Sequence, residues 1–477
     1  MLRATGMASA TMTAPAAPPL VLFASLGNVG QLNPLLAIAE CFAKQHSGVR
    51  TVLATSRERE RAVRAAGLEF LAIWDSCELS EETCRRFNDA GIRNVDAMVY
   101  NCTELLRSEA NYRLPAARLE AWVAEHRPWL MVCDTLTEAA LSVALRAQVP
   151  FIVNTPLPPY FNFPECLPKI FPPFGSGTSL VKISWWHRLY DLAVVVRYGY
   201  ALVTKLKPII DQDSAAGVPA PDAYGAGAVA FFNNTSPLLA DPRVAWPDKV
   251  QWIGTVLSET SARLVQPKHF AEAWARVGDD PANQPLHTWM ETAKSSGSPI
   301  VVVSLGSIYR LDAPRVQAIY DALRPLPVHV LWKLSASEQA HLPPDARTND
   351  RFWVLEWFTD PMLVLAHPSV KLHINHGGAN TLHEALYFGK PQVCLPAWLD
   401  CFDFAMRLQD AGAGRSIDTA PHLDATQLLV AAKEVLFDNP SYVERAARLA
   451  DDLRARGGAA AAAALVAETL QVRRSTL

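Results

Sequence analysis

The chain has 477 residues, half of them hydrophobic and 19% charged, which predicts two or more domains folded around large cores. Its formal net charge of -3 argues against a nucleic-acid partner bound mainly through phosphates. No stretch of about 18 apolar residues occurs, so we expect no membrane-spanning helix.

The N-terminal residues and the cysteines bear on where the protein works. Residues 1–18 are rich in Ala, Thr and Pro and lack the apolar core of a secretion signal, so we expect a flexible tail. A cleaved organelle-targeting segment is the alternative. The eight cysteines are scattered, form no CxxC pair and show no zinc-like spacing with histidine. We therefore expect a reduced, cytoplasmic protein without a metal site.

Short apolar runs alternate with helical patterns in both halves of the chain. Strands are predicted at 20–25, 51–55, 130–134, 151–155 and 229–234, and again at 300–307, 329–334, 352–357, 371–378 and 391–396. Continuous apolar strands separated by helices indicate parallel sheets that are covered on both faces. We therefore predict an α/β chain with two doubly wound, Rossmann-like domains, at 19–253 and 254–456. The Ala-rich end, 457–477, is predicted to be a helix that could dock on either domain.

Residues 156–208 interrupt this pattern. The stretch 156–177 is dense in Pro and aromatic residues, and 179–207 mixes apolar and basic residues. We interpret the segment as an insertion that walls an apolar substrate cleft. A loop and helix that only cover the sheet, or a peripheral contact with a membrane surface, are the alternatives. The pair Trp185 and Trp186 is expected to pack in a core.

The strand around 371–375 ends in His376-Gly377-Gly378, and a helix is predicted to begin at about Asn380-Thr381. Glycines let the backbone approach a ligand closely, and the free amides and dipole of a helix start favour an anion. This pattern predicts a metal-free phosphate site. Gly306-Ser307 could form a second donor loop. Glu384 could accept hydrogen bonds from ribose hydroxyls, and Trp357 and Phe358 offer a flat face to a base.

The stretch 355–415 resembles the signature of family-1 glycosyltransferases, the UDP-sugar-dependent enzymes of the GT-B fold. The matching positions are His367, Pro368, Val370, His376, Gly378, Asn380, Glu384, Ala385, Leu386, Gly389, Pro391, Pro396, Trp398, Asp400 and Ala405. The resemblance covers most of the chain, and residues 1–18 and 156–208 least. It implies two Rossmann-like domains that face each other across a cleft, with the donor held by the second domain. It also implies a final helix that returns to the first domain.

The resemblance carries functional roles to individual positions. It places the diphosphate donors on His376, Gly378, Asn380 and Thr381, a ribose acceptor on Glu384, a phosphate-loop residue on Ser307, and sugar-binding residues on Asp400 and Trp398. The family's Gln after that acid is Cys401 here, its following Asn is Phe404, and its stacking Trp falls on Phe358, beside Trp357. Base and sugar therefore stay open: UDP-glucose is the default donor, and another hexose or a GDP-sugar is the alternative. His367 and His373 are expected to be structural. Asp403 is expected to be a solvated surface acid, with a contact to the sugar as the alternative.

The family's catalytic His falls on Gln31, whereas its orienting Asp is matched by Asp134. Four interpretations follow. In the first, Asp134 takes the acceptor's proton, directly or through water, while Gln31 orients the acceptor. In the second, a distant His is the base, with His187 as the candidate. In the third no strong base is needed, and in the fourth the chain binds the nucleotide sugar without catalysing transfer. We favour the first. Without the resemblance, Asp134 would be read as a helix cap.

The resulting expectation is an inverting, metal-independent hexosyltransferase that has no cofactor beyond its nucleotide-sugar co-substrate. Its acceptor is expected to be a lipophilic hydroxylated small molecule or lipid, as in secondary-metabolite or glycolipid glycosylation. The competing hypotheses are a GT-B sugar-nucleotide epimerase and an inactive nucleotide-sugar-binding paralogue.

Overall fold

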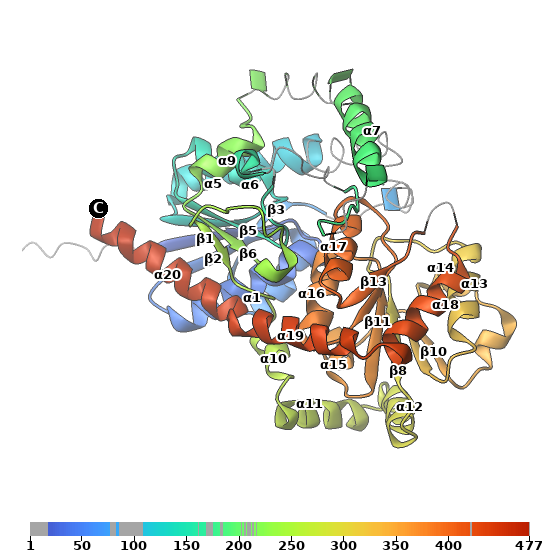
Figure 1. Cartoon of the computed structure of the whole chain (residues 1–477). Coiled ribbons are helices and arrows are strands. Elements are labelled where there is room, and N and C mark those ends of the chain that lie inside the picture. The colour runs from blue at the N-terminus through green and yellow to red at the C-terminus, as the bar shows by residue number, and fades with distance from the viewer. Residues whose placement is uncertain are drawn as a thin grey trace, which may run out of the picture.

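The computed structural model describes residues 18–76, 83–84, 108–160, 162–167, 175–181, 185–201, 203–204, 207, 211, 214–215, 217–419 and 422–476. These residues form two α/β lobes, each built on one parallel sheet (Figure 1). The predicted tail, 1–18, lies almost wholly outside the described residues, as does part of the 156–208 insertion. The predicted fold class is confirmed.

The first lobe contains a seven-stranded parallel sheet among the described residues. Its strands follow the order β3 (Glu69–Trp74), β2 (Arg50–Ser56), β1 (Leu20–Ala24), β4 (Leu130–Asp134), β5 (Phe151–Thr155), β6 (Ala230–Asn233) and β7 (Val250–Trp252). One face is covered by α5 (Leu114–His126), α6 (Glu138–Arg146) and α9 (Pro221–Gly227), and the other by α1 (Val29–Gln45) and α20 (Gly458–Thr476). Burial on both faces explains why the central strands are continuously apolar.

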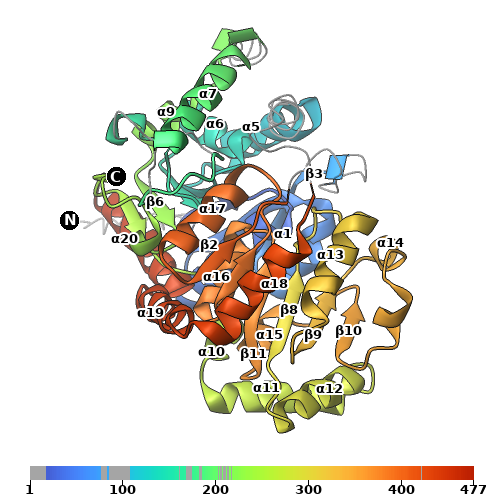
Figure 2. The same cartoon turned by 45° about the vertical axis from the view of Figure 1, so that its right-hand side comes forward.

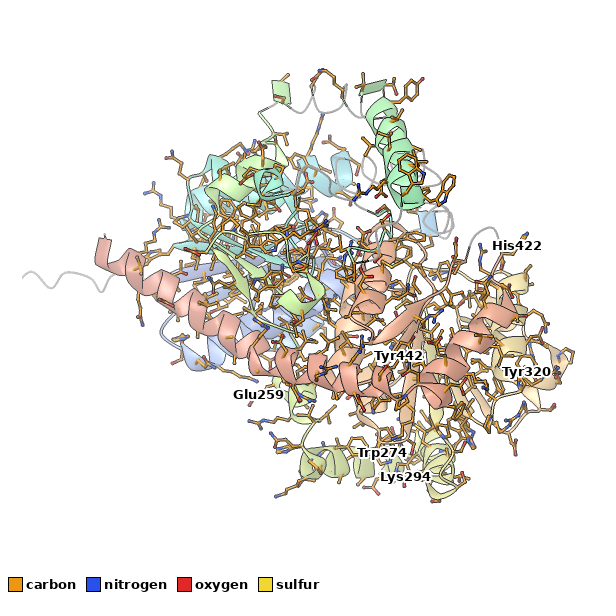
Figure 3. The ribbon with its side chains drawn as sticks, in the orientation of Figure 1. Glu259, Trp274, Lys294, Tyr320, His422 and Tyr442 are labelled. Carbon is orange, nitrogen blue, oxygen red and sulfur yellow. The ribbon has the colours of Figure 1, made fainter. Side chains whose placement is uncertain are left out.

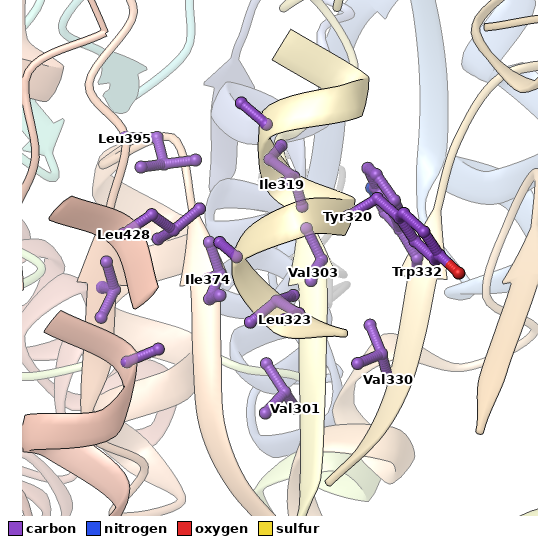
Figure 4. Packing of buried hydrophobic residues seen from close by; sticks show 14 of the residues in the cluster. Val301, Val303, Ile319, Tyr320, Leu323, Val330, Trp332, Ile374, Leu395 and Leu428 are labelled. Atoms are coloured by element: carbon purple, nitrogen blue, oxygen red, sulfur yellow. The ribbon is translucent and has the colours of Figure 1, made fainter. Parts of the chain in front are cut away.

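Among the residues that the structure describes, the second lobe is built on a six-stranded sheet. Its strands follow the order β10 (Phe352–Leu355), β9 (His329–Lys333), β8 (Ile300–Ser304), β11 (Val370–Asn375), β12 (Gln392–Cys394) and β13 (Gly414–Ser416). On one face α13 (Ala313–Leu323) and α18 (Ala425–Lys433) pack around the fully buried Trp332, Ile319 and Ile374 (Figure 4). This face holds one apolar core of the second lobe.

The opposite face of the second sheet is covered by α11 (Pro267–Asp279), α12 (Gln284–Ser295) and α15 (Pro361–Ala366). Trp274 of α11 and Lys294 of α12, labelled in Figure 3, mark this layer. His367 is fully buried here, next to the ring of Trp274, and burial lowers its pKa to about 4. His367 is therefore a neutral packing residue.

The last two helices connect the lobes. α19 (Ser441–Ala455) packs on α16 (Ala379–Tyr387) of the second lobe, and α20 then crosses to the first lobe, where it lies along α1 (Figure 1). Small side chains such as Ala462 and Ala463 are fully buried against the α1 residues Ile38 and Phe42. The Ala-rich composition of this end therefore lets two helices approach closely.

Four further helices are α2 (Glu60–Ala65), α7 (Trp185–Ala201), α10 (Glu259–Arg263) and α14 (Ala336–Gln339). α7 stands away from the body of the molecule in both views (Figures 1 and 2). Trp185 and Trp186 in its first turn are 67% and 74% exposed, so the expectation that this pair packs in a core is wrong. Within the described ranges, no helix combines the length and the apolarity that a membrane crossing requires.

Candidate active site

Residues 376–381, the predicted anion site, lie where β11 ends and α16 begins. Gly378 is the N-cap of α16, and its position provides no side-chain cap for the helix's first amides. The first turn of α16 contains no acidic residue. Uncapped amides at the positive end of a helix dipole favour a bound anion such as a phosphate.

His376 lies between two glycine backbones at the mouth of this helix. A Cβ on Gly306 would lie 2.7 Å from His376 Cε1, and a Cβ on Gly378 would lie 2.3 Å from Nε2. Both positions therefore need glycine. His376 is buried, and its Nδ1 has no hydrogen-bond partner among the described residues. Burial, together with the nearby Lys333, lowers the pKa of His376 to about 4. The imidazole is thus a neutral hydrogen-bonding group.

Positive charge comes instead from Lys333, a residue that the sequence analysis missed. Lys333 is the last residue of β9, and its Nζ donates a 2.8 Å hydrogen bond to the carbonyl oxygen of Gly306. The same Nζ lies 3.9 Å from the ring centroid of Trp357, which is 67% exposed. Burial lowers the pKa of Lys333 to about 8. Lys333 therefore adds a cationic group next to His376, at the predicted phosphate site.

Other predicted donor residues surround this point. Ser307 is exposed in the loop after β8, where its carbonyl oxygen accepts a 2.8 Å hydrogen bond from Arg310. Thr381 and Glu384 are half-buried on α16, and burial raises the pKa of Glu384 to about 7. Phe358, in contrast, packs against the core next to α15. Of the two aromatic candidates for the base, Trp357 is the exposed one.

The predicted sugar-binding residues lie at the start of α17 (Leu399–Asp410). The ring of Trp398, its N-cap, lies 5.5 Å from the ring of His376. Asp400 is half-buried, and burial, with the charge of Asp403, raises its pKa to about 7. Cys401 is 0% exposed, and burial raises its pKa well above the usual value. In this structure the Cys401 thiol therefore points away from solvent.

The predicted donor site contacts the first lobe through Asn380. The Asn380 side-chain amide donates a hydrogen bond to the carbonyl oxygen of Gly30, next to Gln31 in the first turn of α1. That carbonyl is available because Pro34, four residues on, has no N–H to close the helical bond. The sequence Gly30 to Pro34 therefore brings Gln31 to the N-terminus of α16.

Asp134 lies at the end of β4, the strand next to β1. Its side chain is 1% exposed, and one carboxylate oxygen accepts a 2.9 Å hydrogen bond from the backbone N–H of Leu136. The N-cap of α6 is Thr137, so Asp134 is not the cap of that helix. Burial raises the pKa of Asp134 to about 7. Half-ionised near neutral pH, this carboxyl group has the pKa that suits a general base.

The loops that carry Gln31 and Asp134 are tied together. The backbone N–H of Leu26, before α1, donates a 2.9 Å hydrogen bond to the Thr137 hydroxyl, just beyond Asp134. The half-buried Gln31 side chain has no hydrogen bond to another described residue, and neither it nor Asp134 bonds the other. The side chain of His187 lies outside the described residues, so that candidate base is not placed.

Two more residues of this region were not recognised from sequence. The side-chain amide of Asn154, the register partner of Asp134 on β5, is buried without a hydrogen-bond partner among the described residues. Asp403, expected to be a solvated acid, is half-buried and accepts backbone hydrogen bonds from Gly175 and Gly177 of the first lobe. The expectation for Asp403 is wrong, because the acid is occupied by an interdomain contact.

Comparison with solved structures defines the fold class. The calicheamicin glycosyltransferase CalG4 aligns with a TM-score of 0.61 at 18% identity, over 96% of this chain and 99% of that one. Os79 from O. sativa, solved with U2F and a trichothecene, aligns with a TM-score of 0.63 at 18% identity, over 95% and 100% of the two chains. The chain has the GT-B fold of these glycosyltransferases.

Sequence comparison finds relatives over part of the chain. The model of the UDP-glucoronosyl and UDP-glucosyl transferases matches residues 244–454. UDP-glucuronosyltransferase 2C1 of Oryctolagus cuniculus is 35% identical over 170 residues, 35% of this chain and 32% of that protein. UDP-glucuronosyltransferase 2B7 of Homo sapiens is 35% identical over 169 residues, 35% and 30% of the two chains. These matches span about a third of each relative. Residues 244–454, which contain the predicted motif, are therefore similar to the UDP-glucoronosyl and UDP-glucosyl transferases.

Proposed function

We propose that the protein transfers a hexose, with inversion, from a UDP-sugar to a hydroxyl group of a lipophilic small molecule or lipid. UDP-glucose is the default donor. The observation that carries this proposal is the contact between Asn380 and Gly30, which sets the anion site of α16 beside Gln31. A phosphate group and an acceptor hydroxyl would thus meet at one place.

In the proposed reaction the acceptor oxygen attacks the anomeric carbon of the sugar while the bond to the diphosphate breaks. The acceptor proton passes to Asp134, directly or through water, and UDP leaves with the electron pair of the broken bond. A pKa of about 7 for Asp134 supports this role, because a substantial fraction is ionised at neutral pH. Gln31 cannot take a proton, so its role is to orient the acceptor.

The leaving diphosphate gains negative charge, and the surroundings of α16 would stabilise it. The uncapped amides of α16, the neutral His376 and the ammonium group of Lys333 supply hydrogen bonds and one positive charge. We propose that these groups do the work of a metal ion. Trp357, exposed and next to Lys333, would take the uracil ring.

The exposed face of α7 supports a peripheral contact with a membrane surface. Trp186, Val196 and Tyr200 are 74%, 65% and 70% exposed on this helix. Residues 179–207 carry five Lys and Arg residues against the single acid Asp191. Aromatic side chains and basic charge suit the interface of an anionic bilayer. A cosedimentation assay with anionic and neutral vesicles tests this contact by comparing the wild type with the double variant Trp185→Ala/Trp186→Ala. Vesicle binding that is unchanged in the double variant would contradict it.

The overall proposal is tested by mass spectrometry of the purified chain with several nucleotide sugars and a library of hydroxylated acceptors. A glycosylated product together with released UDP supports the proposal. Isomerised nucleotide sugar formed without acceptor would identify an epimerase, and tight donor binding without turnover would identify a binding paralogue. A variant with His376→Ala, run in parallel, assigns any turnover to the site described above.

A further inference from the structure

Residues 175–181, part of the first lobe, lie against α17 of the second lobe. The backbone N–H of Gly175 donates a 2.7 Å hydrogen bond to one carboxylate oxygen of Asp403, and that of Gly177 donates a 3.0 Å bond to the other. Both oxygens of a half-buried carboxylate are therefore used by one loop. Bonds to an ionised acceptor of this kind are stronger than neutral ones.

A second acid on the same helix repeats the arrangement. Asp410 accepts a 2.6 Å hydrogen bond from the Ser179 hydroxyl and a 2.8 Å bond from the backbone N–H of Leu180. Asp403 and Asp410 are seven residues apart, and so lie on the same face of α17. We call residues 175–181, together with these two acids, the clasp. It joins the lobes at four hydrogen-bond donors.

The loop sequence suits this contact closely. Gly175 and Gly177 both have positive φ, of 77° and 60°, which side chains rarely adopt. A Cβ on Gly177 would lie 3.2 Å from the Cβ of Phe402, so the loop backbone rests directly on α17. Thr178 and Ser179 are buried, although they are polar, and the Thr178 hydroxyl donates a 2.7 Å hydrogen bond to Asp191 of α7. The clasp therefore connects α17 with α7, the helix that follows residues 175–181 in the insertion.

The position of α17 gives the contact its functional meaning. The helix begins with Trp398 and Asp400, the residues at the sugar side of the site, and Asp403 follows one turn later. Resting on the proposed function, we propose that Asp403 and Asp410 are positioning residues. They hold residues 175–181 of the acceptor-side insertion in register with the sugar site and so set the affinity and selectivity for the acceptor.

The test compares Asp403→Asn with Asp451→Asn, an exposed acid on α19 that makes only a surface pair with Arg454. In Asp403→Asn, an NH2 group replaces one carboxylate oxygen and cannot accept the hydrogen bond that a backbone N–H of residues 175–181 donates there. We expect the KM for the acceptor to rise roughly tenfold, since a hydrogen bond to a charged group is lost. The KM for the UDP-sugar should change less than the KM for the acceptor, because the groups around α16 are untouched and only the charge that raises the pKa of Asp400 is removed. Hydrogen exchange of the amides of 175–181 should accelerate.

Glycine variants test the same contact from the other side. Gly177→Ala should reproduce the acceptor effect, whereas Gly67→Ala, which has a φ of 75° but no atom within 4 Å of its added Cβ, should not. Unchanged exchange at 175–181 in Asp403→Asn would overturn the clasp itself. Faster exchange with an unchanged acceptor KM would overturn its positioning role. A wild-type chain without transfer activity would count against the proposed function, while the exchange result still decides the clasp.

Discussion

The substitution Asp134→Asn tests the proposed base most sharply. Asparagine has nearly the same shape, and its side-chain oxygen can still accept the hydrogen bond from Leu136. The variant loses only the ability to take a proton. Positioned general bases contribute roughly 10²–10⁴-fold to a rate, so we expect kcat to fall by about that factor.

The pH dependence of kcat/KM gives a second quantitative test of Asp134. Because the pKa of Asp134 is about 7, the ionised fraction rises about tenfold between pH 6 and pH 8. The wild-type kcat/KM for transfer should rise accordingly, and the rise should vanish in Asp134→Asn. The assay follows UDP release and glycosylated product across this pH range. A variant that keeps both the rate and the pH rise would refute Asp134 as the base.

Stability separates lost chemistry from lost structure. Burial raises the folded pKa of Asp134 above its unfolded value, so the unfolded state releases this proton first. The carboxyl group therefore destabilises the fold increasingly as pH rises from about 4 to about 7, by roughly 4 kcal/mol at most. Asp134→Asn should have an equal or higher melting temperature at pH 8. A large drop in melting temperature would mean that Asp134→Asn is structurally damaged. Asp134→Glu would then be the test, and its pH dependence of kcat/KM should be shifted from that of the wild type.

Three further predictions concern neighbouring positions. Gln31→His should keep or raise activity, since it restores a proton acceptor in a loop tied to that of Asp134; a loss above about tenfold would assign Gln31 its own positioning role. Lys333→Met should weaken UDP binding roughly tenfold or more. The wild type should also lose affinity for UDP above pH 8, where Lys333, with a pKa of about 8, loses its charge, and the variant should not show this loss. Calorimetric titration with UDP measures both effects. Cys401→Gln should lower the free energy of unfolding by about 1–3 kcal/mol without improving sugar binding, because position 401 is fully buried; a tighter UDP-sugar complex at unchanged stability would contradict this placement.

The apolar strands could be predicted because their signal is local. Runs such as 130–134 and 300–304 are buried on both faces and are apolar up to their last residues, Asp134 and Ser304. β3, β7 and β13 were missed because they are edge or outer strands: β3 begins with the exposed Glu69, and β13 is only Gly414–Ser416. Edge strands need less apolar surface, so their sequence pattern is weaker.

The candidate donor site could be proposed from sequence for the same reason, since His376 to Glu384 are contiguous in the chain. The residues that were missed come from elsewhere in the chain. Lys333 enters from β9 through Gly306, and the clasp joins Gly175 to Asp403 across 228 residues. The charge of a lysine that ends an apolar strand was the one local signal that could have revealed Lys333. No local pattern distinguishes a clasp carboxylate such as Asp403 from an acid on the surface.

The central claim is that a nucleoside diphosphate binds at the start of α16. Calorimetric titration with UDP measures this directly. The test variant is the double change His376→Ala/Asn380→Ala, and the control is His422→Ala, which alters an exposed side chain labelled in Figure 3. The account predicts that the test variant loses at least about tenfold in affinity, since two hydrogen-bonding groups are removed, while the control binds as the wild type does. Unchanged affinity in the test variant would contradict the account.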